Sequence, residues 1–162
     1  MNNIYLLLGS NQGERAIMLS KAIELLNKQL GNTLSVSPIY ETAAWGKTDQ
    51  PNFLNQAVLI NSTHNAIETL RIINDIESEL GRERKVHWGQ RTIDIDILFF
   101  NRAIIDSPKL VIPHPQLHNR RFALTPLSAI APDFIHPILL KNIHALLDEC
   151  TDPLSVFLYS SF

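Results

Sequence analysis

The sequence is poor in several features that define large classes of proteins. Among its 162 residues there is a single cysteine, Cys150, which excludes a disulfide framework and a cysteine-based zinc site. The 14 Lys and Arg residues are matched by 16 Asp and Glu residues, so no basic excess favours a nucleic-acid or membrane partner. No hydrophobic run is long enough for a signal peptide or a membrane span. We therefore expect a cytoplasmic monomer whose partners are small molecules.

Two familiar phosphate-binding motifs are missing as well. The chain contains neither G-x-x-x-x-G-K-[ST] nor G-x-G-x-x-G, the glycine-rich loops that hold phosphates through backbone N–H groups. A nucleotide site in this protein would have to use other groups.

Apolar residues are plentiful, at 45% of the chain, which is enough for one domain over residues 1–162 with a real core. Their spacing predicts strands at 3–9, 33–40, 53–60 and 90–100, and helices at 19–30 and 67–80. Strand, helix, strand, strand, helix, strand is the ferredoxin-like βαββαβ pattern, an α+β fold with helices on one face of an antiparallel sheet.

Glycine and proline residues indicate where several of these segments end. Gly31 and Gly81 follow the two helices where C-terminal caps belong, and Pro38 indicates that strand 33–40 is an edge or an end. The long irregular loop at 40–52 is a functional candidate. Additional C-terminal elements include a short helix near 142–149.

The strand QRTIDIDILFF, residues 90–100, carries an unusual pair of acids. Its isoleucines and Phe99 alternate with Asp94 and Asp96, so one face is apolar and the other holds two carboxylates whose Cα atoms are about 6.6 Å apart. A water-facing strand is the simplest interpretation of an isolated D-x-D pair. The other is a site for Mg²⁺, which prefers hard oxygen ligands and typically takes one or two carboxylates.

The segment before this strand favours the metal site. Residues 82–91 hold four Lys or Arg residues and one acid, Glu83. A cationic loop that leads into a carboxylate pair suits a polyphosphate, because Mg²⁺ can bridge it on one side and guanidinium groups can bind it on the other.

The stretch HWGQRTIDIDIL resembles the signature of the 6-hydroxymethyl-7,8-dihydropterin pyrophosphokinases of folate biosynthesis. Further segments occur in the order and spacing of that family and cover nearly the whole chain: LGSN (8–11), QPNFLNQAV (50–58), VIPHP (111–115) and NRRFALTPLSAIAP (119–132). The resemblance implies a ferredoxin-like kinase of the transferase class that moves the pyrophosphoryl group of ATP to the pterin hydroxymethyl oxygen and releases AMP.

Roles for individual residues follow from the same resemblance. It implies that Asp94 and Asp96 hold two Mg²⁺ ions and that Arg82 and Arg91 act with them in catalysis. The ATP contacts it implies are Glu77, Arg84, Arg91, Ile97, His114 and Arg120. The pterin contacts it implies are Thr42, Ala43, Trp45, Gly46, Phe53, Asn55, Asp94 and Phe122. Arg84 and Trp88 would belong to a mobile loop that closes over the substrates.

Each of these residues also has a plainer explanation. Phe53 and Phe122 could be core aromatics, Asn55 a strand amide that satisfies backbone, and His114 an ordinary loop histidine. Glu77 could be a solvent-facing partner for an arginine of the loop. The chain also departs from the family at Gln90, His87 and Ala43-Ala44. We expect these departures to affect the rate, the order of the loops and the affinity for substrates, but not the presence of activity.

Two other functions fit parts of the pattern. Ferredoxin-like sheets can bind RNA, but the sequence lacks an RNP1-like run, and paired aspartates on the binding face would repel phosphate in the absence of a metal. A different Mg²⁺-dependent nucleotide transferase on the same fold is the remaining alternative.

Overall fold

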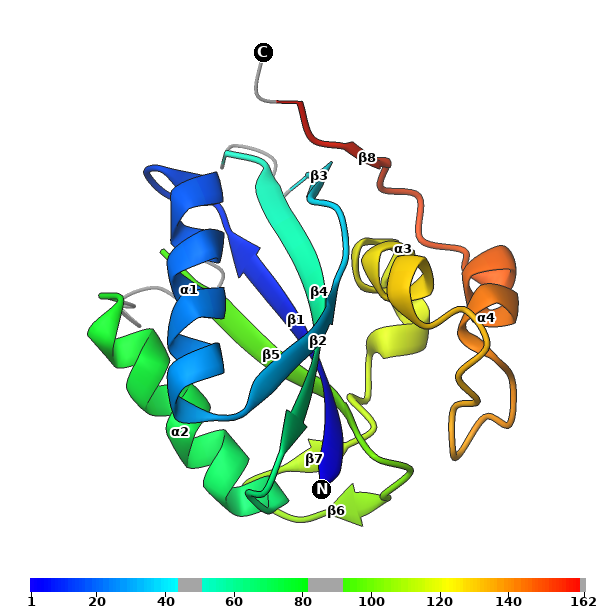
Figure 1. Cartoon of the computed structure of the whole chain (residues 1–162). Helices are drawn as coiled ribbons and strands as arrows, with labels where there is room; N and C mark the ends of the chain where they lie inside the picture. Colours follow the sequence, from blue (N-terminus) through cyan, green and yellow to red (C-terminus); the bar gives the residue numbers. More distant parts are fainter. Residues whose placement is uncertain (44–50, 82–91, 161–162) are drawn as a thin grey trace.

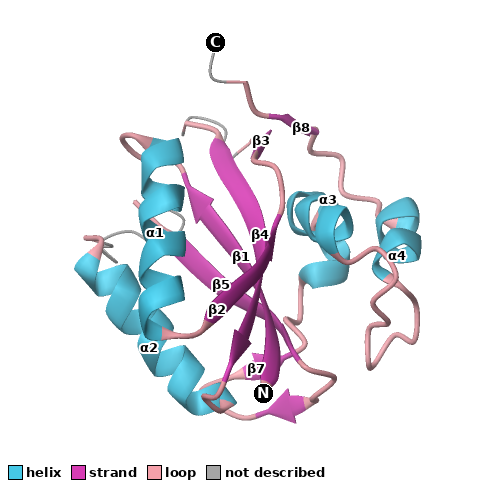
Figure 2. Cartoon of the chain, in the orientation of Figure 1, coloured by secondary structure: helices cyan, strands magenta, loops and turns pink. Residues whose placement is uncertain are grey.

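The computed structural model describes residues 1–43, 51–81 and 92–160 (Figure 1). Within them the chain is a mixed α/β protein with an antiparallel sheet and four α-helices (Figure 2). The helices are α1 (Arg15–Gln29), α2 (Ala66–Glu79), α3 (Arg121–Ile130) and α4 (Ile143–Glu149). The main sheet contains β1 (Asn2–Ser10), β2 (Asn32–Val36), β3 (Tyr40–Thr42), β4 (Phe53–Ser62), β5 (Asp94–Phe100) and β8 (Val156–Leu158).

The sheet is arranged around β1 and β4, which pair along their whole lengths from Asn2↔Ser62 to Ser10↔Leu54. Strand β5 pairs with β1 on one side, and both β2 and β3 pair with β4 on the other. Strand β8 extends the sheet beyond β3. A small separate ribbon joins β6 (Ile105–Asp106) to β7 (Val111–Ile112), and a 3₁₀-helix covers Leu117–Asn119.

The predicted strand at 33–40 is in fact two strands, β2 and β3, separated at Pro38. Proline has no backbone N–H and cannot continue a ladder. Just before the proline, Ser37 satisfies both backbone groups of Ala57 on β4. Its hydroxyl accepts a hydrogen bond from Ala57 N at 2.9 Å, and its backbone N–H donates to Ala57 O. The break lets the chain leave β4 after Val36 and return to it at Tyr40.

The glycine predicted as a C-terminal cap has the expected backbone conformation after α2 but not after α1. Helix α2 begins with a capping box between Asn65 and Glu68 and ends before Gly81, whose φ of +84° fits the left-handed cap. Gly31 follows α1 but has no positive φ. Glycine is needed there for a different reason, since a Cβ would collide with the backbone oxygen of Asn61 on β4.

The two faces of the sheet are covered differently. Helices α1 and α2 lie on one face, and α3 and α4 lie on the other (Figure 1). The first face packs Leu6, Leu8 and Ile60 against Leu19 and Ile73 in a large apolar core. The second builds a smaller core from β1, β5, α3 and α4.

Strand β5 changes face partway along its length. Its register with β1 shifts between Tyr5 and Leu6, which pair with Phe99 and Ile97, so Leu98 is the extra residue of a β-bulge. The prediction that Phe99 shares a face with Ile97 is therefore wrong: Ile97 belongs to the first core and Phe99 to the second. A bulge interrupts the period of two, and nothing in the local apolar pattern announces it.

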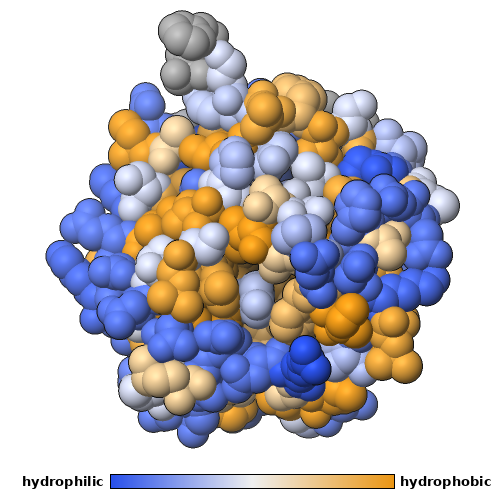
Figure 3. Space-filling model, turned by 45° about the vertical axis from the view of Figure 1, so that its right-hand side comes forward, coloured by the Kyte–Doolittle hydropathy of each residue, from blue (hydrophilic) through white to orange (hydrophobic). Residues whose placement is uncertain are grey.

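No helix in the described part of the chain is long and apolar enough to cross a membrane. On the face shown in Figure 3, hydrophobic areas alternate with hydrophilic ones.

Candidate active site

The two aspartates of β5 lie on the sheet face opposite α1 and α2. Ile95 and Ile97 point into the core beneath those helices, so the alternating Asp94 and Asp96 point the other way. Both are partly exposed, and they sit beside Gly9 and Leu7 of β1. The predicted carboxylate pair on one face is present.

Strand β4 contributes a second polar group to this face. Gly9 pairs with Asp94 on one side and with Asn55 on the other, and a Cβ at Gly9 would lie 2.9 Å from Asn55 Oδ1 and 3.6 Å from the Phe53 ring. Asn55 is only 3% exposed, and its Nδ2 has no hydrogen-bond partner within the described structure. A buried amide nitrogen without a hydrogen-bond partner is costly unless a ligand satisfies it. This argues against the plainer explanation that Asn55 satisfies backbone.

The start of α3 adds a cation and an aromatic ring. Arg120 is the residue before the helix and Phe122 is in its first turn. The Arg120 guanidinium carbon lies 5.6 Å from the centre of the Phe122 ring. Since α3 packs against β4, these residues and Asn55 belong to the same side of the sheet.

His114 belongs to the same group of side chains. Burial lowers the pKa of His114 to about 4, with the Arg120 charge acting in the same direction and the Asp94 charge opposing it. The imidazole is therefore neutral at neutral pH. Its Nδ1 accepts a hydrogen bond from Gln116 N at 3.2 Å, which leaves the proton on Nε2 to be donated to a ligand.

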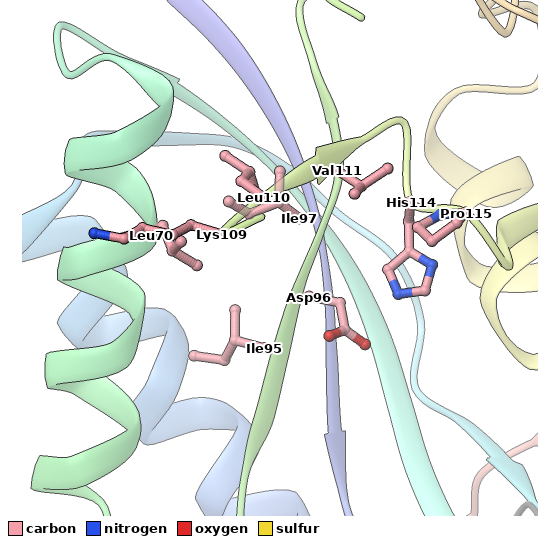
Figure 4. Close-up of a pocket in the computed structure, with 9 residues that line it drawn as sticks. All are labelled: Leu70, Ile95, Asp96, Ile97, Lys109, Leu110, Val111, His114 and Pro115. Atoms are coloured by element: carbon pink, nitrogen blue, oxygen red, sulfur yellow. The ribbon is translucent and has the colours of Figure 1, made fainter. Parts of the chain in front are cut away.

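A pocket opens at the edge of β5 (Figure 4). Its walls include Leu70 of α2, Asp96 and Ile97 of β5, and Lys109, Val111 and His114 of the segment beside β5. In Figure 4 the Asp96 carboxylate and the His114 ring lie on the same side of β5. The pocket thus joins one of the two acids to an apolar surface.

Glu77 is buried, at 5% exposure, so the explanation of it as a solvent-facing partner is wrong. Its Oε2 accepts a hydrogen bond from Ile95 N at 2.8 Å. On the same outer edge of β5, Leu98 O accepts from His114 N at 3.1 Å. These contacts satisfy backbone groups of an edge strand and fix the strand that carries both aspartates.

The remaining predicted residues are placed only in part. Thr42 is buried in β3, with its hydroxyl donating to Ser155 O at 3.0 Å, and Ala43 follows it directly. The others lie outside the described residues: Trp45, Gly46, Arg82, Arg84, Trp88 and Arg91, and with them the departures at Ala44, His87 and Gln90. Lys109 and Gly9 were not predicted. Gly9 is the next-to-last residue of β1, and the segment LGSN (8–11) was the signal that could have pointed to it.

The chemistry of the donor set suits a hard cation. Asp94 and Asp96 offer carboxylate oxygens, and no group of three or more His, Cys, Asp or Glu residues occurs in the ranges the structure describes. Two carboxylates with open positions fit Mg²⁺ shared with phosphate oxygens better than a closed protein cage.

Comparison with known proteins identifies the family. Residues 5–132 match the family model for 7,8-dihydro-6-hydroxymethylpterin-pyrophosphokinase. The 2-amino-4-hydroxy-6-hydroxymethyldihydropteridine pyrophosphokinase of Bacillus subtilis is 48% identical over 132 residues, 80% of this chain and 79% of that protein. The enzyme of the same name from Aquifex aeolicus is 40% identical over 151 residues, 93% of this chain and 94% of that protein.

The fold has solved counterparts. The crystal structure of Plasmodium falciparum HPPK-DHPS matches with a TM-score of 0.72 at 20% identity, which supports the fold. The match covers 92% of this chain but only 43% of that one. By the family match and the two bacterial relatives, this chain belongs to the 7,8-dihydro-6-hydroxymethylpterin-pyrophosphokinase family.

Proposed function

We propose that this chain is a Mg²⁺-dependent pyrophosphokinase of folate biosynthesis, with a ferredoxin-like core and a single domain over residues 1–162. It transfers the β,γ-pyrophosphoryl unit of ATP to the hydroxymethyl oxygen of 6-hydroxymethyl-7,8-dihydropterin. The products are AMP and the pterin pyrophosphate. Membership of the family and the names of the bacterial relatives support this reaction.

One observation carries the proposal: the carboxylate pair lies between two different binding surfaces. On one side of β5, across β1, is the buried and unpartnered amide of Asn55. On the other side is the pocket at the strand edge. A reaction between two substrates needs such an arrangement, because each must be held with its reacting atom near the same charged groups.

The Asn55 side would take the pterin. The edge of a pterin ring carries donors and acceptors that a buried amide can match, and Phe53 and Phe122 offer flat apolar faces for the ring itself. Thr42, which pairs with Phe53 across β3 and β4, and Ala43 would belong to the same surface. Gly9 leaves the floor between Asn55 and Asp94 free of a side chain.

The edge pocket would take the nucleotide. Leu70, Ile97 and Val111 form an apolar wall suited to a purine base, and Lys109 and Arg120 supply positive charge for its phosphates. His114, neutral and protonated on Nε2, would contribute a hydrogen bond without adding charge. Glu77 supports this side by holding β5 in place.

Asp94 and Asp96 would hold two Mg²⁺ ions, which neutralise the triphosphate and lower the pKa of the acceptor hydroxyl when bound. The protein's own contribution is to keep both carboxylates on one face and both substrates beside them. Arg82 and Arg91 would add phosphate contacts from the basic segment, and Arg84 and Trp88 would close over the bound substrates.

The decisive experiment is to incubate the full chain with Mg·ATP and 6-hydroxymethyl-7,8-dihydropterin and separate the products by anion-exchange chromatography. AMP and pterin pyrophosphate in equal amounts are expected, with no AMP when the pterin is left out. ADP in place of AMP would mean a simple kinase. AMP without pterin would mean another acceptor.

A further inference from the structure

The last described part of the chain ties two walls of the pterin surface to each other. We call residues 150–159 the C-terminal strap. They lie beyond residues 5–132, the part of the chain that the family model matches. Figure 1 shows this segment running from α4 past α3 to β3, where β8 pairs.

One attachment of the strap is to the start of α3. Asp152 is only 6% exposed, and its Oδ2 accepts a hydrogen bond from the backbone N–H of Arg121, the first residue of the helix. Its other oxygen accepts from Leu154 N at 3.0 Å. The Arg121 side chain returns the contact by donating to Cys150 O at 2.7 Å and to Asp152 O at 3.2 Å. A carboxylate at this position satisfies a free N–H group and stabilises the positive end of the helix dipole.

The other attachment is to β3, three residues further on. Ser155 O accepts a hydrogen bond from the Thr42 hydroxyl, and β8 continues the sheet by pairing Val156 with Thr42. Tyr159 N then donates to Ile39 O at 2.9 Å. The strap therefore connects the start of α3 to strand β3 within a few residues.

Arg15, on α1, joins the end of the strap to β3 and to the residue before β4. Its guanidinium lies 5.9 Å from the centre of the Tyr159 ring. The same group contacts Oε2 of Glu41 in β3 at 3.0 Å, and it donates to O of Asn52, just before β4, at 2.8 Å.

The two attachments fall next to the residues that would sandwich the pterin. Arg121 lies between Arg120 and Phe122, and Thr42 pairs with Phe53 across β3 and β4. We propose that the C-terminal strap sets the position of Phe122 relative to Phe53, and that Asp152 is a positioning residue for the pterin. This inference rests on the proposed function. None of the residues that line the pocket at the edge of β5 belongs to the strap. Of the residues proposed to contact ATP, Arg120 adjoins the attachment at Arg121, so we expect a large effect on the pterin and a small one on ATP.

The test is the variant Asp152→Asn in the full-length protein, assayed for AMP formation over a range of both substrates. The amide has one accepting oxygen in place of two, so one of the hydrogen bonds from Arg121 N and Leu154 N is lost. We expect the KM for the pterin to rise about tenfold because small displacements of positioning groups are costly. The KM for ATP should stay within about twofold of wild type by the same principle. Asp148→Asn is the matched control, since Asp148 is exposed on α4 and contacts only His144 among the ion pairs of that helix.

An equal rise of the KM values for the pterin and for ATP would contradict the inference. If both KM values and the unfolding midpoint change in parallel, Asp152 has only a structural role, and an unchanged pterin KM overturns the proposal outright. Should Asp152→Asn fail to fold, Arg121→Gln tests the same attachment, because it removes the contacts to Cys150 O and Asp152 O and keeps the backbone bond to Asp152. Its pterin KM should rise and its ATP KM should not; no difference between the two overturns the proposal.

The assay also separates this inference from the proposed function. Wild-type protein that forms no AMP counts against the function itself. Wild-type protein that turns over, with Asp152 and Arg121 variants unchanged, counts against the strap alone.

Discussion

The two faces of the main sheet are built from alternate residues of the same strands, yet they do different work. Beneath α1 and α2, Leu6, Leu8 and Ile60 close an apolar core. On the opposite face the same strands present Asn55, Asp94 and Asp96 beyond the limits of the smaller core. The core beneath α1 and α2 holds the strands in register on this closed face, so the opposite, open face can carry polar groups in place of a continuous apolar layer.

The largest expected effect is on activity at the open face. Asp94→Asn and Asp96→Asn, tested separately, should each lower turnover at saturating Mg²⁺ by about 10³-fold, because a positioned charge near the transferred group is lost. The free energy of unfolding should change far less than the activity, because both side chains are partly exposed to solvent. Product formation and urea titration measure the two quantities. Asp75→Asn, on the exposed side of α2, is the control. Near wild-type turnover in either active-site variant would refute the metal assignment.

Substitutions in the core beneath α1 and α2 should lower stability and leave activity nearly unchanged. Leu8 is fully buried in the large core, and Leu8→Ala should lower the free energy of unfolding by about 3 kcal/mol through lost burial and a cavity. The folded fraction should keep its KM values. Leu34 on β2 is 58% exposed, and Leu34→Ala should cost less than about 0.5 kcal/mol. Urea denaturation of the three proteins compares them directly, and equal losses for the two leucines would contradict the burial of Leu8 in the large core.

The smallest effect is the most specific, because it compares neighbours on opposite faces. Asn55 has an unpartnered buried amide, whereas Gln56 donates from Nε2 to Ser37 O at 2.8 Å. Asn55→Leu should raise the free energy of unfolding by about 1 kcal/mol, and Gln56→Leu should lower it by a similar amount. Only Asn55→Leu should weaken pterin binding, measured by fluorescence titration. Destabilisation by Asn55→Leu would indicate that its amide serves the fold.

Local spacing predicts much of the closed face. Strands β1 and β4 and helices α1 and α2 are long and regularly patterned, so period and caps locate them within a few residues. The pair Asp94 and Asp96 is also visible locally, since two residues on one strand share a face whatever the rest of the chain does.

What depends on distant contacts is not predictable in this way. The bulge at Leu98 arises from pairing with β1, and β8 exists only because β3 offers an edge. The local pattern does not predict helix α3, because Pro126 interrupts its signal. Lys109 reaches the site through the β6–β7 ribbon, and no spacing rule connects that ribbon to β5. The structure supplies these relations because it places together residues that are far apart in the chain.

The bare floor at Gly9 has a consequence for inhibition. A compound that rests on main-chain atoms between Asn55 and Asp94 would contact a position that has no side chain to exchange. Any larger residue there would press against the Asn55 amide, 2.9 Å from the site of its Cβ, and would disturb the group proposed to recognise the natural substrate. Resistance at this position would therefore come at the expense of the enzyme's own reaction.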